Sequence, residues 1–438
     1  MTERYPLTGR TATEIVASLE STVRAGALVA GDLVPTVRAL AAHLGVAPGT
    51  VASAYRTAQQ RGLIETHGRN GTRVRASRAL GSRSAGTTLP VGVVDLASGQ
   101  PAAALLPRLV VTRPQEPAAA PGVLVLPGLA ALARERLAAD GVDATHLTLA
   151  GGGLDAIRRV LAARLAPGDA VAVEDPGWPN LLDLVAATGL RTLPLAVDAD
   201  GPRPGALSAA LEDGARAVVV TSRAQNPTGA HVTAERAGAL RPVLARHPDV
   251  LVVEDDHAAE LARVPLATLS GATRSWAFVR SLSKPYGPDL RLAVLAGDET
   301  TVARVEGQLR IGSGWVSTLL QRAALGLWSD PGVADVVAAA ADAYDARRLA
   351  LLIALERAGL SAVGAGGLNV WVRVPDETRV VADLLAAGWA VAPGRRFLQS
   401  SGSYVRVTVS NLALEQVDPL VAAFRAAVGQ APVGPSTV

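Results

Sequence analysis

The sequence contains no cysteine, and it contains a single lysine. The absence of cysteine excludes disulfide bonds, thiolate metal ligands and cysteine nucleophiles. No apolar stretch is long enough to span a bilayer without a glycine, proline or charge, and the first ten residues lack the apolar segment of a secretion signal. The expectation is therefore a soluble protein in the cytoplasm.

The scarcity of lysine draws attention to one position. Of the 42 cationic residues, 41 are arginine and one, Lys284, is lysine. A guanidinium group stays protonated, whereas a lysine amine can lose its proton and attack a carbonyl carbon. Retention of lysine at this position therefore predicts a chemical role for it, with chance survival as the alternative.

The length and charge distribution indicate more than one domain. A chain of 438 residues with a hydrophobic fraction of 49% is large enough for two or more buried cores. The net charge is +3, but residues 1–92 carry eleven arginines and five acidic residues, which gives +6 there and −3 in the remainder. This distribution predicts a nucleic-acid-binding face near the N-terminus, with an ordinary solvated basic surface as the alternative.

The first 75 residues have the pattern of three helices followed by a hairpin. A helix beginning near Thr11 repeats an apolar side chain at every fourth position. A second helix is expected after Thr36, a suitable N-cap, and a third over about 48–61. The pair Asn70-Gly71 between short apolar runs favours a β-hairpin.

This arrangement resembles the winged helix-turn-helix of GntR-type regulators along the whole stretch LVPTVRALAAHLGVAPGTVASAYRTAQQRGLIETHGRNGTRV. The resemblance implies that residues 1–75 bind double-stranded promoter DNA, through the major groove and its phosphates and through a wing beside the minor groove. The implied DNA-binding residues are Thr36, Arg38, Gly49, Thr50, Tyr55, His67 and Gly71. Pro48 stands where the family usually has arginine, and Ala52 is uncharged, which predicts weaker base readout. A helix-turn-helix used only for protein contacts is the alternative.

Residues 76–92 are small and polar without periodicity, which predicts a flexible linker to a domain over 93–430. In that domain short apolar runs alternate with amphipathic helices, a pattern typical of an α/β fold with a mainly parallel sheet covered on both faces. Ligands of such sheets bind at the carboxyl ends of the strands. The segments expected at those ends are 151–153, 174–178, 222–226, 255–257 and 281–284.

Several of these segments carry residues suited to a phosphorylated carbonyl ligand. The glycines at 151–153 precede a helix and favour phosphate binding by backbone N–H groups, although an ordinary tight turn has the same pattern. Asp255 can hold a positive charge at a sheet edge or cap a helix. One strand end brings hydroxyls, an amine and a guanidinium together, in Ser281, Ser283, Lys284 and Arg291. No histidine or carboxylate pattern completes a metal site beside Asp255, so no metal is expected.

The order of these segments resembles the fold-type I pyridoxal 5′-phosphate aminotransferases, and the winged helix in front of them resembles the MocR subfamily of GntR-type regulators. The resemblance covers nearly the whole chain. It implies an aminotransferase-like α/β domain with a smaller C-terminal α+β part and pyridoxal 5′-phosphate bound covalently to Lys284. The implied cofactor-binding residues are Gly151, Gly152, Gly153, Trp178, Asn226, Asp255, His257, Ser281, Ser283, Lys284 and Arg291, and Arg406 is implied to bind a substrate carboxylate.

The resemblance also implies a role for each of these side chains. Trp178 in EDPGWPN would stack on the pyridine ring, Asn226 in RAQNPTG would meet its hydroxyl, and Asp255 in VEDDHAAEL would keep the ring nitrogen protonated. The serines and the arginine of SLSKPYGPDLR would bind the phosphate. His257 stands where the family usually has tyrosine, and the phosphate turn has glycines where side-chain donors are common, which predicts cofactor binding with less efficient transamination.

Together these features predict a transcription regulator that binds promoter DNA as a homodimer and senses pyridoxal 5′-phosphate or an amine or amino-acid effector. The EDDH, RAQNPTG and SKxxGPDLR motifs are similar to those of the branch that includes repressors of pyridoxal kinase genes, so the regulated genes are expected to concern vitamin B6. One alternative is a catalytically active aminotransferase with an accessory DNA-binding head. Another is a cofactor-free dimeriser, against which the retained Lys284 argues.

Overall fold

The computed structural model describes residues 7–24, 27–29, 31–60, 63–66, 71–74, 88–109 and 123–429. The chain divides into two compact units, which are taken separately below. Among the predicted features, His67, Asn70 and most of the expected linker lie outside the described residues.

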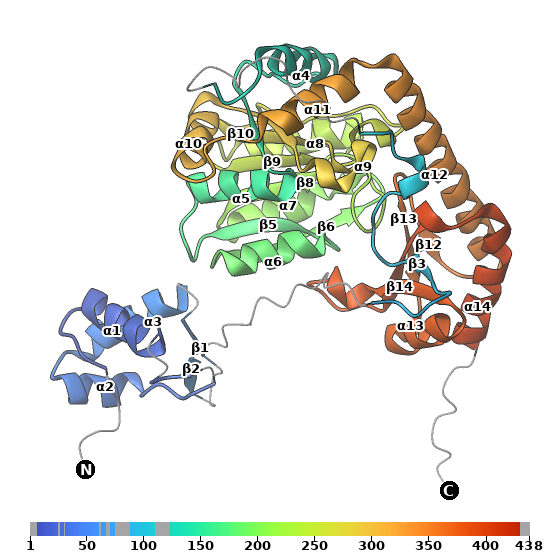
Figure 1. Ribbon diagram of the computed structural model, residues 1–438. Helices are drawn as coiled ribbons and strands as arrows, with labels where there is room; N and C mark the ends of the chain where they lie inside the picture. Colours follow the sequence, from blue (N-terminus) through green and yellow to red (C-terminus); the bar gives the residue numbers. More distant parts are fainter. Residues whose placement is uncertain are drawn as a thin grey trace, which may run out of the picture. The chain divides into compact units, whose positions relative to one another are not determined.

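The N-terminal unit contains three helices and a two-stranded antiparallel hairpin (Figure 1). Its elements are α1 (Ala12–Arg24), α2 (Val37–Leu44), α3 (Pro48–Gln60), β1 (Ile64–Thr66) and β2 (Thr72–Val74). Helices α1 and α2 both contact α3, and the core between them includes Leu19, Leu40 and Val51. The predicted N-cap is confirmed, because the Thr36 hydroxyl accepts a hydrogen bond from the Ala39 N–H (3.2 Å). The unit is a winged helix-turn-helix.

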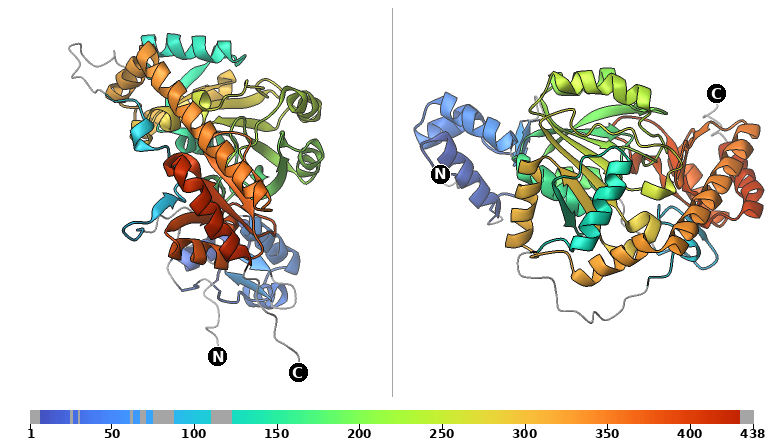
Figure 2. Two further views of the ribbon diagram at one scale, coloured as in Figure 1. Left: turned by 90° about the vertical axis from the view of Figure 1, so that its right-hand side faces the viewer. Right: turned by 90° about the horizontal axis from the view of Figure 1, so that it is seen from above.

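An eight-stranded sheet forms the centre of the second unit, with helices on both of its faces (Figure 2). The strand order is β4-β11-β10-β9-β8-β5-β6-β7. The strands are β4 (Leu147–Ala150), β5 (Ala170–Asp175), β6 (Arg191–Asp198), β7 (Gly201–Pro202), β8 (Ala215–Thr221), β9 (Leu251–Asp256), β10 (Ser275–Ser281) and β11 (Ala293–Gly297). The helices are α4 (Pro127–Ala139), α5 (Gly153–Arg164), α6 (Pro179–Ala187), α7 (Pro204–Glu212), α8 (Ala234–Ala245), α9 (Ser283–Tyr286), α10 (Glu299–Ile311) and α11 (Thr318–Ser329).

The sheet is mixed, and its register aligns the strand ends that the sequence singled out. Strands β8, β9 and β10 are parallel neighbours, whereas β11 is antiparallel to both β10 and β4. The connection over 282–292 is too short for a crossover helix, so the chain returns antiparallel. Ser281 pairs with Ala293, which pairs with Ala150, so β10 and β4 end at the same edge. Asp255 pairs with Thr221, which brings β8 and β9 to that edge as well.

A smaller five-stranded sheet of order β12-β13-β15-β14-β3 forms the α+β part that the resemblance implied. Its strands are β12 (Ala362–Val363), β13 (Asn369–Arg373), β15 (Tyr404–Thr408), β14 (Trp389–Pro393) and β3 (Val94–Leu96), and its helices are α12 (Pro331–Arg357), α13 (Glu377–Ala386) and α14 (Val417–Gly429). Strand β3 pairs in parallel with β14, so a segment near residue 95 completes a sheet made otherwise from the C-terminal part of the chain.

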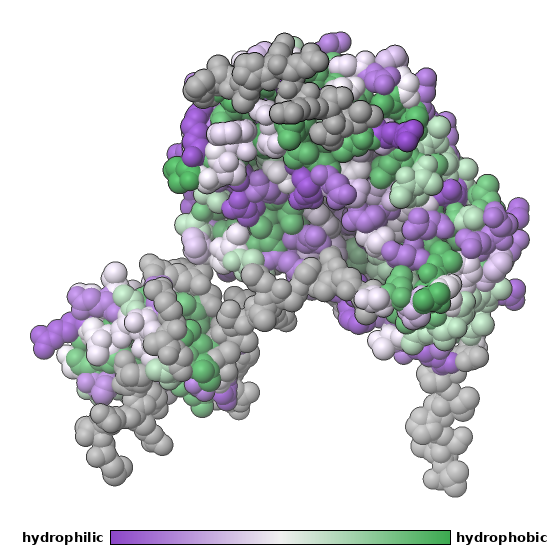
Figure 3. Space-filling model, viewed as in Figure 1, coloured by the Kyte–Doolittle hydropathy of each residue, from purple (hydrophilic) through white to green (hydrophobic). Residues whose placement is uncertain are grey.

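The apolar side chains are concentrated in separate interiors. One buried cluster surrounds the large sheet and includes Phe278, and another, including Phe424, lies between the small sheet and its helices. On the face shown in Figure 3, hydrophilic residues are interspersed with hydrophobic ones. Within the described residues, no helix combines the length and the apolar character needed to cross a lipid bilayer.

Candidate functional site

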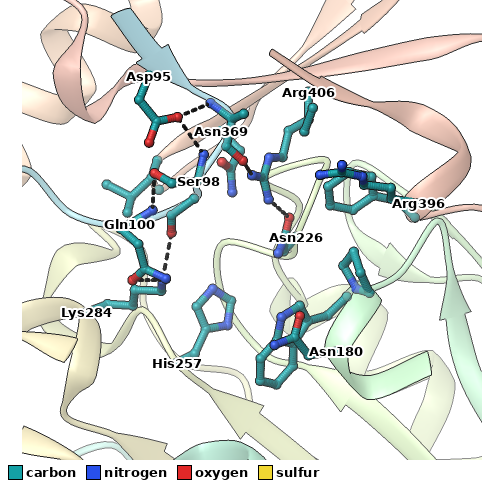
Figure 4. A pocket seen from close by; sticks show the side chains of 18 of the residues that line it. Asp95, Ser98, Gln100, Asn180, Asn226, His257, Lys284, Asn369, Arg396 and Arg406 are labelled. Carbon is teal, nitrogen blue, oxygen red and sulfur yellow. Dashed lines mark hydrogen bonds between the residues drawn. The ribbon is translucent and has the colours of Figure 1, made fainter. Parts of the chain in front are cut away.

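The strand ends of the large sheet and the edge of the small sheet enclose a cavity of about 680 Å³ (Figure 4). This volume lies in the range of small-molecule and cofactor sites. Ten predicted residues line it, namely Gly153, Trp178, Asn226, Asp255, His257, Ser281, Ser283, Lys284, Arg291 and Arg406. Segments that are far apart in the sequence therefore contribute to one pocket.

One end of the pocket has the features of an anion site. The Arg291 guanidinium donates a hydrogen bond to the Gly151 carbonyl (3.0 Å), and helix α5 begins at Gly153. Gly152 has φ = 104°, and a Cβ there would lie 3.0 Å from Arg291 Nη2. The buried Ser283 hydroxyl has no hydrogen-bond partner among the described residues. Helix N-terminal amides, a free hydroxyl and a guanidinium suit a phosphate group.

Two consecutive carboxylates on β9 have different environments, because successive strand residues point to opposite faces. Asp256 is fully buried and paired with two guanidinium groups, those of Arg223 (2.7 Å) and Arg280 (2.8 Å). Asp255 faces the pocket and is 4% exposed, with its Oδ2 3.7 Å from Nδ1 of His257. Its Oδ1 has no hydrogen-bond partner among the described residues.

This unpaired oxygen tests whether the pocket fits pyridoxal 5′-phosphate. A buried carboxylate oxygen without a donor is costly, and a protonated ring nitrogen would provide the missing donor. The anion site supplies a complementary place for the phosphate group. The residues present therefore fit this cofactor, from the ring nitrogen at Asp255 to the phosphate at the α5 N-terminus.

Lys284 lies in α9, the short helix that follows β10, and its amine points into the pocket. The Nζ donates hydrogen bonds to the Gly99 carbonyl (2.6 Å) and to Gln100 Oε1 (3.1 Å). Burial and the nearby Arg406 charge lower the pKa of the Lys284 amine to about 8, against the opposing effect of Asp255. With this pKa a minor fraction of the amine, on the order of one tenth, is neutral at pH 7, and this neutral form is the one that attacks an aldehyde.

Arg406 lies on β15 of the small sheet and is 4% exposed. Its guanidinium donates to Asn226 Oδ1 (3.0 Å) and to the Ala97 carbonyl, and it lies 4.8 Å from the centre of the Phe397 ring. Burial and the neighbouring Arg396 lower the pKa of Arg406 to about 10. Its Nε has no hydrogen-bond partner among the described residues, so the group retains capacity to bind a carboxylate.

A buried glutamate connects the two loops that carry Trp178 and Asn226. Glu174 accepts hydrogen bonds from the Thr221 N–H (2.9 Å), the Thr221 hydroxyl (2.8 Å) and the Gln225 amide (3.2 Å). The same Gln225 amide donates to the Pro176 carbonyl (2.7 Å). Burial raises the pKa of Glu174 to about 7. The loops following β5 and β8 are thereby fixed relative to one another.

The sequence reasoning missed several segments of the pocket. One follows β3 and provides Ser98, Gly99 and Gln100, another provides Arg395 and Arg396 in the turn Gly394–Arg396 after β14, and a third covers 367–369. Figure 4 shows Asp95, Asn369 and Arg396 around the same cavity. A glycine–glutamine–proline turn after a short apolar run and the doubled arginine of PGRRF were the available signals.

The predicted DNA-binding residues of the N-terminal unit fall into two groups. Thr36 and Arg38 at the start of α2 are exposed, as is Gly49 at the start of α3, while Thr50 and Gly71 are partly exposed. Tyr55 is only 6% exposed, and its hydroxyl donates to the Pro35 carbonyl (2.7 Å). Its described contacts hold α3 against the segment before α2.

Comparison with known families and proteins gives two consistent matches. The family described as aminotransferase class I and II matches residues 91–424, and the family described as bacterial regulatory proteins, gntR family, matches residues 11–74. A vitamin B6 salvage pathway transcriptional repressor, PtsJ, of Salmonella typhimurium is 37% identical over 420 residues, covering 94% of this chain and 97% of that protein.

Further similarities are to another transcription regulator and to solved aminotransferase structures. The pyridoxine biosynthesis transcriptional regulator PdxR of Corynebacterium glutamicum is 27% identical, over 58% of this chain and 57% of its own. A mutant aspartate aminotransferase of Thermus thermophilus is 25% identical with a TM-score of 0.64, covering 69% of this chain and 86% of that one. An archaeal alanine:glyoxylate aminotransferase, 21% identical with a TM-score of 0.70 over 78% of this chain and 91% of its own, shares the fold.

Proposed function

Because this chain belongs to the class I and II aminotransferase family and carries a gntR-family DNA-binding domain in front of it, we propose that it is a transcription regulator whose DNA binding responds to pyridoxal 5′-phosphate held on Lys284. The observation that carries the proposal is the position of the chain's one lysine. Its amine shares a pocket with the unpaired oxygen of Asp255 and with an anion site at the start of α5.

Several residues of the pocket have a task in this proposal. The bound cofactor would supply an aldehyde that reacts reversibly with amines. Lys284 would provide the attacking amine, Asp255 would accept a hydrogen bond from the protonated ring nitrogen, and Trp178 would cover the ring. Arg291, the Ser281 and Ser283 hydroxyls and the backbone of 151–153 would hold the phosphate. Arg406 binds the carboxylate of an amino-acid effector through its unpaired Nε and the rest of its guanidinium group.

The similarity to a vitamin B6 salvage repressor supports vitamin B6 genes as the regulated set. Regulation requires that the ligand bind two arrangements of the protein with different affinity, since equal affinity shifts no equilibrium. DNA affinity of the full-length chain must therefore change when the cofactor or an amine is added.

A homodimer is the second part of the proposal. Three apolar side chains lie exposed at the end of α10 and the start of α11: Ile311 (90%), Trp315 (57%) and Leu319 (44%). Clustered exposed apolar groups of this kind mark contact surfaces. A two-fold dimer would present two winged helices to two half-sites.

The test begins with the visible absorption of the full-length chain mixed with pyridoxal 5′-phosphate, followed by borohydride reduction. Since the chain has one lysine, one cofactor per chain should become permanently attached, with the N-terminal amine as the only competing primary amine. Lys284→Arg is the matched control, because it keeps the positive charge and removes the nucleophile. No attachment in the wild type, or equal attachment in this variant, contradicts the proposal.

The second step measures DNA binding. Duplexes selected from a random pool by the full-length chain would be titrated with and without the cofactor, at fixed salt concentration because phosphate contacts depend on it. A change in dissociation constant that is lost in Lys284→Arg supports sensing. An unchanged dissociation constant would be compatible with DNA binding by this chain but would contradict its control by the cofactor.

Retention of both Lys284 and Arg406 in one pocket also favours a second function, an active aminotransferase with an accessory DNA-binding head. Release of a keto acid from an amino-acid donor, measured over many turnovers with a keto-acid acceptor present, separates the two. Sustained turnover would make catalysis the primary activity.

A further inference from the structure

Arg396 brings a further guanidinium group into the pocket. It ends the turn Gly394–Arg396 that follows β14, whereas Arg406 lies on the neighbouring strand β15. Both side chains line the cavity, and Figure 4 shows them on the side of the pocket formed by the small sheet. The positive charge of Arg396 is close enough to lower the pKa of Arg406.

No anion neutralises Arg396 among the described residues. Its neighbour Arg395 donates to Glu377 (2.9 Å), but Arg396 has neither a hydrogen-bond acceptor nor a carboxylate partner there. Burial and Arg395 both lower the pKa of Arg396. A partly buried cation beside Arg395, without a carboxylate partner among the described residues, retains its donors for an anionic ligand.

The other arginines of the cavity already have assigned partners, and that of Arg395 is Glu377. Arg291 bonds to the Gly151 carbonyl at the end of the pocket where α5 begins, and so belongs to the phosphate site. Arg406 is held by Asn226 and by the Ala97 carbonyl, and its charge is partly balanced by Asp95. With Arg291 assigned to the cofactor phosphate and Arg406 to one carboxylate, Arg396 remains without an assigned ligand.

We infer that the effector is an amino acid whose side chain carries a second anionic group, bound by Arg396 while Arg406 binds the α-carboxylate. The inference rests on the proposed function, since the amino group of such an effector is directed to the cofactor carbon. A planar guanidinium group binds a carboxylate or a phosphate through two parallel hydrogen bonds, so either group on the effector side chain would suit Arg396. The cavity of about 680 Å³ has room for such a ligand beside the cofactor.

The experiment compares ligands that differ by one charge. The full-length chain loaded with pyridoxal 5′-phosphate would be titrated with L-glutamate against L-glutamine, L-aspartate against L-asparagine, and O-phospho-L-serine against L-serine. Isothermal calorimetry and the change in visible absorption give dissociation constants. A charge-assisted hydrogen bond corresponds to at least about tenfold tighter binding of the anionic member of a pair. The glutamate and phosphoserine arms distinguish a carboxylate from a phosphate.

We define the charge ratio as the dissociation constant of the neutral member of a pair divided by that of the anionic member. Arg396→Gln should reduce this ratio to near one and should leave the affinity for the neutral member within about twofold. Arg396→Lys should retain part of the ratio, because it restores the charge without the planar fork. Arg357→Gln is the matched control, since it removes one positive charge from an exposed residue at the end of α12 that does not line the cavity. The control should keep the wild-type ratio.

The inference is overturned if wild-type protein binds the members of each pair equally, or if Arg396→Gln keeps the full ratio. Failure of the proposed function has a different result, namely no borohydride-fixed cofactor. In that case calorimetry with the cofactor-free chain still decides whether Arg396 discriminates by charge, because both arginines belong to the protein.

Discussion

At the scale of single residues, the pocket is governed by charges that burial leaves incompletely paired. Lys284 lies between Arg406, which disfavours its protonated form, and Asp255, which favours it. Asp255 keeps one oxygen without a donor, while the adjacent Asp256 is fully paired. In a low-dielectric site such groups interact strongly with any ligand of complementary charge. The charges of the pocket therefore suit a ligand with a cationic ring and anionic substituents.

The charge on Arg406 leads to a prediction about pH. Protonation of Lys284 blocks attack on the aldehyde, so the rate of cofactor attachment should rise with pH through about 8. Arg406→Gln removes a positive charge that lowers the pKa of Lys284, so its profile should move to higher pH. Stopped-flow absorption measured across the pH range gives both midpoints. Arg357→Gln, which removes a positive charge outside the cavity, should leave the midpoint in place, and an unshifted or lowered midpoint in Arg406→Gln would contradict this account.

At the scale of elements, the site depends on the alignment of strand ends. Strands β4, β8, β9 and β10 finish at one edge because their registers match through Ala150, Thr221, Asp255 and Ser281. The turn from β4 into α5 must then bring backbone close to Arg291. Only glycine takes the conformation at Gly152 without strain, since its φ is 104° and a Cβ would lie 3.0 Å from the guanidinium.

Gly152→Ala should destabilise this unit by about 1–3 kcal/mol, the usual cost of a strained backbone conformation, and should weaken cofactor binding by displacing Arg291. Gly205→Ala is the matched control, because a Cβ there meets nothing within 4 Å and alanine favours the helix. All six tryptophans lie between 178 and 389, so their fluorescence during urea unfolding reports on the second unit. If Gly152→Ala and Gly205→Ala changed the free energy of unfolding by the same amount, the backbone conformation of Gly152 would carry no special energetic cost.

At the scale of the whole molecule, the chain combines a winged helix-turn-helix with an aminotransferase-type unit. Each has its own core, one around Leu40 and others around Phe278 and Phe424. A single winged helix reads one half-site, so dimerisation through the second unit would determine how many half-sites are bound together. The exposed Ile311, Trp315 and Leu319 are the surface that we assign to this contact.

The combined substitution Ile311→Glu and Trp315→Glu should convert the protein from a dimer to a monomer of 44.7 kDa in sedimentation velocity. Burying two carboxylates in an apolar contact costs several kcal/mol, which is more than most interfaces tolerate. Leu414→Glu, at a position 54% exposed outside this surface, should leave the dimer intact. A dimer that survives the double substitution would place the contact elsewhere.

Much of this organisation was predicted from the sequence because the decisive signals are local. Helix caps such as Thr36, the single lysine, and short motifs at strand ends depend on neighbours in the chain. Those motifs belong to families whose residues 11–74 and 91–424 match this chain, so the two-part architecture and fold class were predicted correctly. The roles of the individual site residues stay predictions that the proposed experiments test.

Only the tertiary structure decided how distant segments meet. The sequence pattern indicated a mainly parallel sheet, whereas β11 returns antiparallel because its connection is short. The addition of β3 to the C-terminal sheet and the contact of Gly99 with Lys284 both depend on long-range packing. Local sequence determines which residue types end each element, but burial and charge pairing depend on segments that approach only after folding.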